Sequence, residues 1–246
     1  MTELKFPTEV IDLPSRGLLY PKESPLSSGK IEMKYMTAKE EDILTNRNYL
    51  ERGIVVDKLL QSLIVSKVNY TDLVTGDQNA IMIAARILGY GKDYDFVYRG
   101  ERHGVDLTTL NDKPFDETLI TPHVNEFSYR LPHTQTDITF KILTVGDEQK
   151  IKDEINGLKK LNKEAPPELT TRLKYIITSV NNKREPGVIR DFVDNQLLAR
   201  DSRALREYIR KVQPDIDLKV TVNVGGVEED ITLPIDIDFF WPDFRA

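Results

Sequence analysis

The stretch Ile31-Glu32-Met33-Lys34-Tyr35-Met36-Thr37 occurs a second time, in modified form, as Ile138-Thr139-Phe140-Lys141-Ile142-Leu143-Thr144. Both stretches alternate apolar and polar residues, place a lysine at the same position and end on a threonine that precedes an acidic segment. The alternation predicts a half-buried β-strand, and the threonine or the acid after it predicts the start of a helix. The repeat indicates two related copies of one unit.

Two further pairs of segments match in the same order and are interpreted as helical. The apolar stretches that end at Asn69 and Asn181 resemble each other and predict the ends of two helices. The segments that begin at Asp77 and Asp201 are also similar, and each predicts a helix with the aspartate as its N-cap. The shared order favours an internal duplication, with coincidence between two ordinary α+β halves as the alternative.

A fourth pair predicts two β-hairpins. The segments from Asp93 and from Asp215 alternate like strands and continue, through a turn that contains glycine, into returning strands at residues 105–110 and 230–235. We predict an α+β fold of two related copies, each a strand, a helical segment and a terminal hairpin. The expected parts are an extended proline-containing arm (1–29), a first copy (30–115) and a second copy with an aromatic tail (116–246).

The two ends of the chain hold apolar residues that must be buried somewhere. Residues 6–25 include four prolines, which fix φ and remove an N–H donor, so this arm is expected to be extended. Residues 237–244 hold the only tryptophan and three of the nine phenylalanines. Each end docks either on the chain's own core or on a partner. The candidate interaction residues are Leu18, Leu19, Tyr20, Phe239, Phe240, Trp241 and Phe244.

Composition limits the class of protein. The 246 residues include 34 Lys and Arg against 40 Asp and Glu, and the net charge of −6 argues against a general nucleic-acid partner. No cysteine is present, which excludes disulfides, thiolate zinc sites and cysteine nucleophiles. The longest apolar stretch, Ile81–Leu88, is shorter than the ~20 residues that span a bilayer, and no secretory signal is visible. We expect a soluble protein that is intracellular when made.

No motif singles out a catalytic, cofactor-binding or metal-binding site. The three histidines, His103, His123 and His133, are not spaced as helical metal ligands and are expected in turns or at the surface. P-loop and nucleophile-elbow motifs are absent from the sequence. Paired carboxylates leave a hydrolase as an alternative, which requires a cleft with two carboxylates, one with a raised pKa. We expect a protein without enzymatic activity and without a cofactor.

Six short stretches resemble the baseplate hub protein family of T-even-type tailed phages, and they occur in the expected order over nearly the whole chain. Members of that family act in building the central hub of the baseplate, as minor structural subunits or as assembly helpers. The six stretches are residues 13–21 (LPSRGLLYP), 35–44 (YMTAKEEDIL), 76–80 (GDQNA), 201–206 (DSRALR), 214–218 (PDIDL) and 239–242 (FFWP).

The resemblance implies a baseplate hub component that acts by protein–protein binding during tail assembly. Its expected partners are other tail or hub proteins or the tape-measure protein. Its expected location is the virion, or the host cytoplasm during assembly. The alternative role is a tail-assembly chaperone that is absent from the finished particle, and a hub hydrolase is the third.

One departure from the family concerns the two hairpins. Many relatives carry C-x-x-C in them, which suggests a zinc ribbon. The corresponding turns in this chain, residues 99–102 and 223–226, contain no cysteine. The hairpins are therefore expected to be degenerate, zinc-ribbon-like and metal-free, held by turn glycines and strand pairing.

Overall fold

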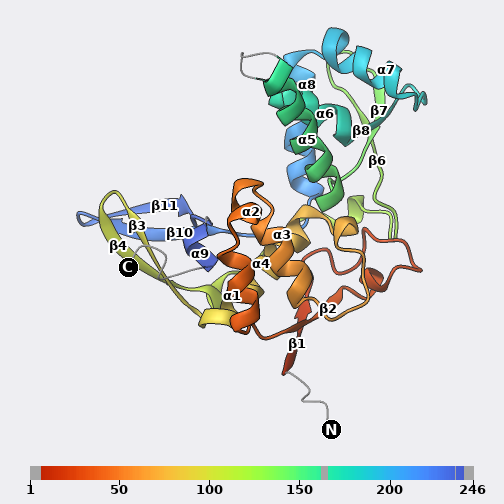
Figure 1. Cartoon of the computed structure of the whole chain (residues 1–246). Helices are drawn as coiled ribbons and strands as arrows, with labels where there is room; N and C mark the ends of the chain where they lie inside the picture. The colour runs from red at the N-terminus through yellow and green to blue at the C-terminus, as the bar shows by residue number, and fades with distance from the viewer. Residues whose placement is uncertain (1–6, 162–165, 236, 241–246) are drawn as a thin grey trace.

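Helices and small antiparallel sheets alternate along the chain, which confirms the predicted α+β class (Figure 1). The structure is a computed structural model and describes residues 7–161, 166–235 and 237–240. Trp241 and Phe244 lie outside the described residues. One continuous cluster of buried apolar side chains includes residues from both halves of the chain, from Leu13 to Phe240.

The first half begins with two paired strands. β1 and β2 are antiparallel, from Thr8 opposite Lys34 to Asp12 opposite Lys30. The alternation in β2 buries one face, since Ile31 and Met33 are 1% and 0% exposed. The α and β elements of this half are β1 (Thr8–Asp12), β2 (Lys30–Lys34), α1 (Ala38–Leu44), α2 (Arg47–Glu51), α3 (Val55–Leu63), α4 (Thr75–Tyr90), β3 (Asp93–Tyr98), β4 (Glu101–Asp106) and β5 (Asp112–Lys113).

The second half repeats this order, with a longer first helix and a third strand in its sheet. β6, β7 and β8 form one antiparallel sheet with β7 in the middle. The elements of this half are β6 (Phe127–Arg130), β7 (Asp137–Phe140), α5 (Val145–Leu161), α6 (Glu168–Ile176), β8 (Ile177–Val180), α7 (Pro186–Asp191), α8 (Ala199–Val212), β9 (Asp215–Ile216), β10 (Lys219–Val224), β11 (Val227–Thr232) and α9 (Ile237–Phe240). Single turns of 3₁₀ or π helix lie at Pro25–Ser28, Tyr70–Asp72, Leu107–Thr109, Glu117–Leu119 and Phe192–Gln196.

The lysine shared by the two copies makes the same contact in each. Lys34 Nζ lies 2.8 Å from the Glu40 carboxylate, and Lys141 Nζ lies 2.8 Å from the Asp147 carboxylate. Each acid is the third residue of its helix, and each also accepts the backbone N–H of the threonine before that helix, at 3.0 and 3.1 Å. Burial opposes ionisation of Glu40, but hydrogen bonds from Lys34, Thr37 and Ser62 outweigh it and lower the pKa to about 2.

The apolar stretches after α3 and α6 are extended, so the prediction that they continue as helix is wrong. α3 ends at Leu63, and Ile64 forms a bridge with Met33 of β2. In the second half Ile177 pairs with Phe140 of β7 at the equivalent position. In each half this extended segment forms hydrogen bonds with the neighbouring strand. Its backbone N–H and C=O groups are therefore paired without the internal hydrogen bonds of a helix.

Both predicted hairpins are present, but their strands return earlier than predicted. The turns are the two-residue pairs Arg99-Gly100 and Gly225-Gly226, all with positive φ, as a type I′ turn requires. β4 and β11 begin directly after these pairs. His103 therefore lies inside β4, and its expected place in a turn is wrong.

The expected boundary at residue 29 does not separate an arm from the first copy. β1 belongs to the same sheet as β2, as β6 belongs with β7, so the first copy begins at Thr8. The arm holds no α-helix among its described residues, but it is folded into β1, a series of turns and a 3₁₀ turn. Its buried apolar residues, Leu13, Leu19, Tyr20 and Leu26, lie after β1, in the turns and the 3₁₀ turn, whereas β1 itself is largely exposed.

The two copies are joined along their backbones. Val74 and Thr144 form an antiparallel bridge, with Thr75 N–H bonded to the Leu143 carbonyl at 3.1 Å and Val145 N–H to the Leu73 carbonyl at 2.8 Å. β5 pairs with β9, which again links the first half to the second.

The terminal hairpins of the two copies lie side by side at one end of the molecule (Figure 1). Tyr98 and Arg99 of the first hairpin both donate to Glu229 of the second, at 3.3 and 2.8 Å. We call these two hairpins, residues 93–106 and 219–232, the hairpin lobe. Residues 127–212, which form the three-stranded sheet and α5–α8, stand apart from it and are called the helix lobe.

Candidate functional site

Asp77, the third residue of α4, fastens the loop that follows β1. Its carboxylate accepts the backbone N–H of Ser15 at 2.8 Å, the Ser15 hydroxyl at 2.6 Å and the Tyr20 hydroxyl at 2.5 Å. The Tyr20 oxygen in turn accepts the backbone N–H of Val74 at 3.0 Å. Burial and the charge of Asp77 raise the pKa of Tyr20 far above its ordinary value, so this hydroxyl stays a donor.

The Asp77 carboxyl has the raised pKa that the hydrolase alternative requires of one acid. Burial raises its pKa to about 6, although the hydrogen bonds from Ser15 and Tyr20 lower it. A catalytic acid must also reach a substrate, whereas Asp77 is 0% exposed. Its role is to hold two segments together that are 62 residues apart in the sequence.

Asp201, the third residue of α8, makes the corresponding contact in the second half. Its two oxygens accept the backbone N–H groups of His133 and Thr134 at 2.9 and 3.0 Å. Burial opposes its ionisation, but these hydrogen bonds lower its pKa. Neither Asp77 nor Asp201 is the N-cap that the sequence predicted, because each carboxylate binds a distant loop and each helix begins two residues earlier.

The two loops that these aspartates hold are themselves similar, a match that the sequence analysis missed. Leu13-Pro14-Ser15-Arg16-Gly17 follows β1, and Leu131-Pro132-His133-Thr134-Gln135 joins β6 to β7. Leu13 and Leu131 are 2% and 0% exposed. The Leu-Pro pair before each turn was the available signal, and it extends the duplication to the first strand of each copy.

The predicted interaction residues of the arm face the chain's own core. Leu19 and Tyr20 are 1% and 3% exposed, and Leu18 is half-buried against the same cluster. His123 fixes this segment, since its backbone N–H donates to the Leu18 carbonyl at 2.6 Å and its Nδ1 lies 3.2 Å from the Tyr20 carbonyl. Of the two alternatives for these residues, docking on the chain's own fold is the observed one.

The aromatic end is also docked on the chain where it is described. Phe239 and Phe240 are 0% and 1% exposed, and the Phe239 ring meets the Tyr94 ring edge-on with centroids 4.9 Å apart. Tyr94 belongs to β3, so the end of the second copy packs on the hairpin of the first. The remaining predicted interaction residues, Trp241 and Phe244, lie outside the described residues.

A polar groove runs between the two halves, along α3 of the first and α5 of the second. Two hollows of about 420 and 370 Å³ share Asp57, Gln149, Lys152 and Asn156 in their walls. Gln149 donates to Asp57 at 3.2 Å, and Lys152 donates to the Gly53 carbonyl at 2.7 Å. The sequence analysis singled out none of these residues, because they meet only when the two halves pack together.

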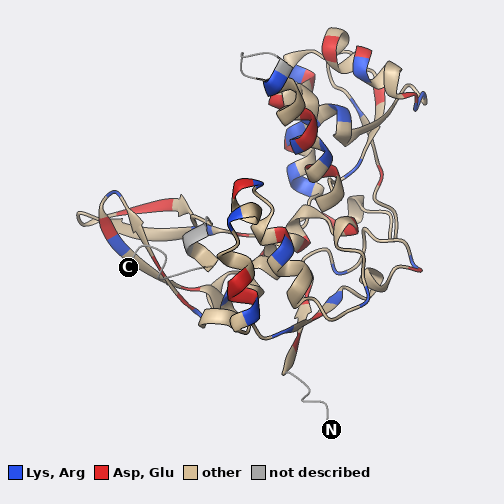
Figure 2. Cartoon of the chain, viewed as in Figure 1, with Lys and Arg blue, Asp and Glu red and all other residues tan. Residues whose placement is uncertain are grey.

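A second exposed feature is the outer face of α8. Arg200, Arg203, Arg206, Arg210 and Lys211 are all exposed, and Glu207 is the exposed acid among them. We call these five cations the arginine face. Figure 2 shows the charged residues of α5–α8 and of the hairpin lobe at their places in the fold.

No group of three or more histidine and acidic residues in residues 7–161, 166–235 and 237–240 is arranged to hold a metal ion. In the same residues, no helix is both long and apolar enough to cross a bilayer. Comparison with models of protein families, with curated proteins and with solved structures gives no match.

Proposed function

We propose that this chain is a component of the baseplate hub of a contractile phage tail and acts in tail assembly by binding other proteins. The proposal rests on the six stretches that resemble the hub family. One observation supports it most: the stretch 76–80 contacts both 13–21 and 214–218, although the three are far apart in the sequence.

Residues 76–80 at the start of α4 lie at the centre of these contacts. Asp77 accepts the hydrogen bonds of Ser15 and Tyr20 from the first stretch. Asn79 donates to Asp215 of the stretch 214–218 at 2.8 Å. The residues behind the resemblance thus fix the packing of the two copies, which supports a fold shared with that family.

At Gly76, within the stretch 76–80, the close approach of another backbone segment requires a glycine. A Cβ added there would lie 1.9 Å from the carbonyl oxygen of Pro214, which is less than any real contact between such atoms. Backbone therefore packs on backbone where the two copies meet. Because Gly76 is needed for packing, its match to the hub family supports a similar fold and says little about a shared chemical activity.

The exposed surfaces are where a partner would bind. Leu19, Tyr20, Phe239 and Phe240 are buried in the chain itself, so these side chains cannot serve as free anchors in this fold. The groove between the halves is one of the hollows in which side chains of both copies converge, another being the hollow between residues 105–114 and 217–221. A partner seated in the groove would contact both copies at once. This makes the groove the first surface to test.

The proposal is tested by mass spectrometry of purified tailed particles together with pull-down of the tagged chain from infected cells. Several copies per particle support a structural hub subunit. Absence from particles, with a stable complex with unassembled tail proteins, supports the chaperone role. Absence from both contradicts the proposal.

Two variants locate the binding surface in the same pull-down. Asn156→Trp fills the groove, because Asn156 is exposed and lines both hollows. Lys150→Trp places the same side chain on another exposed position of α5 and is the matched control. Loss of tail proteins with Asn156→Trp alone identifies the groove, and equal recovery with both variants places the contact elsewhere.

A further inference from the structure

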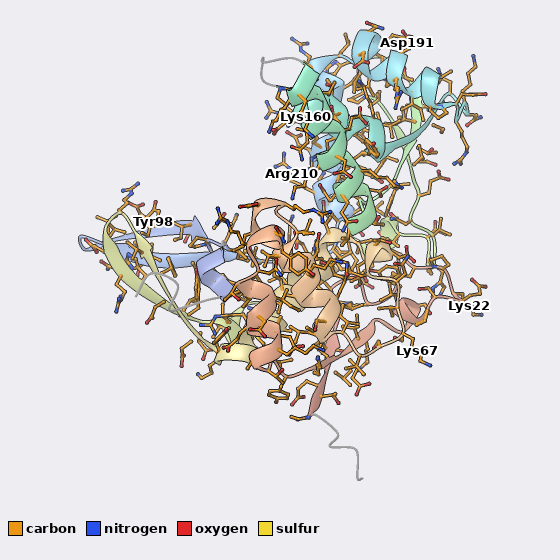
Figure 3. All side chains as sticks on the ribbon, in the orientation of Figure 1. Lys22, Lys67, Tyr98, Lys160, Asp191 and Arg210 are labelled. Atoms are coloured by element: carbon orange, nitrogen blue, oxygen red, sulfur yellow. The ribbon has the colours of Figure 1, made fainter. Side chains whose placement is uncertain are left out.

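Opposite charges are concentrated on separate lobes of the molecule. The helix lobe holds 17 Lys and Arg against 12 Asp and Glu, whereas the hairpin lobe holds three against seven. The chain as a whole has a net charge of −6, so the helix lobe is basic within an acidic protein. In Figure 3, Asp191 marks the far end of the helix lobe, Arg210 lies nearer its base, and Tyr98 marks the hairpin lobe.

The arginine face covers one side of α8. At about 100° per residue, Arg200, Arg203, Arg206, Arg210 and Lys211 all fall within an arc of about 140°. The opposite side of the helix is buried, with Leu205 and Val212 each 0% exposed. Arg203 pairs with Glu207 at 2.9 Å, and the charges of Arg210 and Lys211 also act on the Glu207 carboxylate and help to lower its pKa. Among the described residues, Arg200 and Arg206 have no ion-pair partner.

The position of two of these cations is unfavourable for the helix itself. Arg200 and Arg203 lie in the first two turns, where the positive end of the helix dipole favours acids. The acid of that turn, Asp201, is buried and directed at the backbone of His133 and Thr134. Arg210 and Lys211 suit the C-terminal end, but the dipole does not account for Arg200 and Arg203.

The hairpin lobe has an exposed acidic surface, opposite in charge to the arginine face. In β11, Glu229 points at Arg99 of the other hairpin, so its neighbours Glu228 and Asp230 lie on the opposite, exposed face. Val227, which is 62% exposed, lies on the same face as Glu229, because successive residues of a strand point to opposite faces.

We infer that the arginine face of one molecule binds the acidic face of β11 in a second copy, head to tail. The two surfaces lie on different lobes, so they meet only between molecules. One surface is predominantly basic and the other is acidic, which is the charge complementarity that such a contact needs. Since the contact joins two different surfaces, it leads to rings or open chains of molecules. The inference does not depend on the proposed function.

Sedimentation equilibrium of the purified full chain tests this contact. Association is expected at about 0.1 M salt and should weaken at about 1 M, where the screening length falls from about 10 Å to about 3 Å. Arg200→Glu with Arg206→Glu should weaken association by about ten-fold or more. Both changes suit the helix, because Glu at 200 favours the N-terminal dipole and Glu at 206 lies four residues before Arg210.

The matched control is Lys67→Glu, an exposed change of the same sign away from both lobes (Figure 3). It should leave association unchanged. The reverse change, Glu228→Lys with Asp230→Lys, should weaken association as the arginine variant does. A mixture of the two double variants should restore it, because the altered helix of one meets the altered hairpin of the other.

Three results overturn the inference. A chain that stays monomeric at low salt at every concentration tested does not bind a second copy. Association that ignores the arginine variant places the contact on another surface. The third result has two parts: the mixed variants fail to associate, and the wild-type chain binds nucleic acid or an unrelated acidic protein. It assigns the arginine face to a different partner.

Discussion

Asp77 and Asp201 occupy the third position of α4 and of α8, and both carboxylates accept backbone N–H groups from the loop that follows the first strand of their own copy. The two residues lie in different halves of the chain and make the same type of long-range contact. The internal duplication is therefore visible in the interactions as well as in the order of the elements. It ties the first strand of each copy to that copy's last long helix.

The first prediction concerns the pH dependence of stability. Because burial raises the Asp77 pKa to about 6, the folded state binds a proton that the unfolded state releases near pH 4. The contribution of Asp77 is thus present below pH 4 and is lost as pH rises through 6. Asp77→Asn should gain about 3 kcal/mol relative to wild type between pH 4 and pH 7.

Urea unfolding at a series of pH values measures this difference. The asparagine oxygen still accepts the Ser15 N–H, and its amide can donate to the hydroxyls of Ser15 and Tyr20. Asp77→Ala is the comparison, since it leaves these donors without an acceptor and should destabilise at every pH, by about 2–4 kcal/mol. A difference between Asp77→Asn and wild type that stays constant from pH 4 to 7 would refute a raised pKa.

The second prediction has the opposite sign. The Glu40 pKa is lowered to about 2, so its contribution is present above the unfolded pKa of about 4 and is lost as pH falls toward 2. Glu40→Gln should cost up to about 3 kcal/mol at pH 7 and little at pH 2. The control is Asp42→Asn, an exposed acid in the same helix. Equal effects of the two substitutions at pH 7 would show that the buried ion pair with Lys34 is not formed.

The third prediction compares two glycines within helices. Gly76→Ala places a methyl group 1.9 Å from the Pro214 carbonyl oxygen, so the backbones of the two copies must separate. We expect a loss of about 2 kcal/mol or more in the free energy of unfolding. Gly157→Ala is the control, because nothing lies within 4 Å of its added Cβ, and it should stabilise by about 0.5–1 kcal/mol. Stabilisation by both changes would contradict the close packing at Gly76.

The fourth prediction separates a core role from an interface role for the arm. Leu19 is 1% exposed, so Leu19→Ala should destabilise the isolated chain by about 2–4 kcal/mol. Leu169, at 46% exposed, is the matched control, and its replacement by alanine should change stability by less than about 0.5 kcal/mol. If Leu19→Ala leaves thermal unfolding unchanged, Leu19 does not stabilise the core, and a contact with a partner becomes the explanation for this residue.

Local pattern was enough to predict β2, β7 and the two hairpins. The alternation around Met33 and Phe140 placed β2 and β7, because a half-buried strand requires a period of two. The glycines after Arg99 and at residues 225 and 226 placed both hairpin turns, although not the residue at which each strand returns. These features depend on neighbours in the sequence, and the sequence shows them.

The contacts that decide packing were not predictable in the same way. Aspartate favours both the N-cap and the first turn of a helix, so only the distant loop at Ser15 decides where Asp77 points. The stretch after Ile176 is apolar and fits helix or strand equally well until β7 is there to pair with it. The groove at Asp57 and Gln149 forms only when both halves are packed together, so no local sequence pattern predicts it.

The most direct test of the central claim is a quantitative proteomic count of this chain in purified phage particles and in the baseplate intermediates of infected cells. The account predicts several copies per particle, or, for the chaperone role, a complex with unassembled tail proteins in the cells. A chain that is abundant in infected cells but absent from particles, from baseplate intermediates and from every complex with tail proteins would contradict a role in hub assembly.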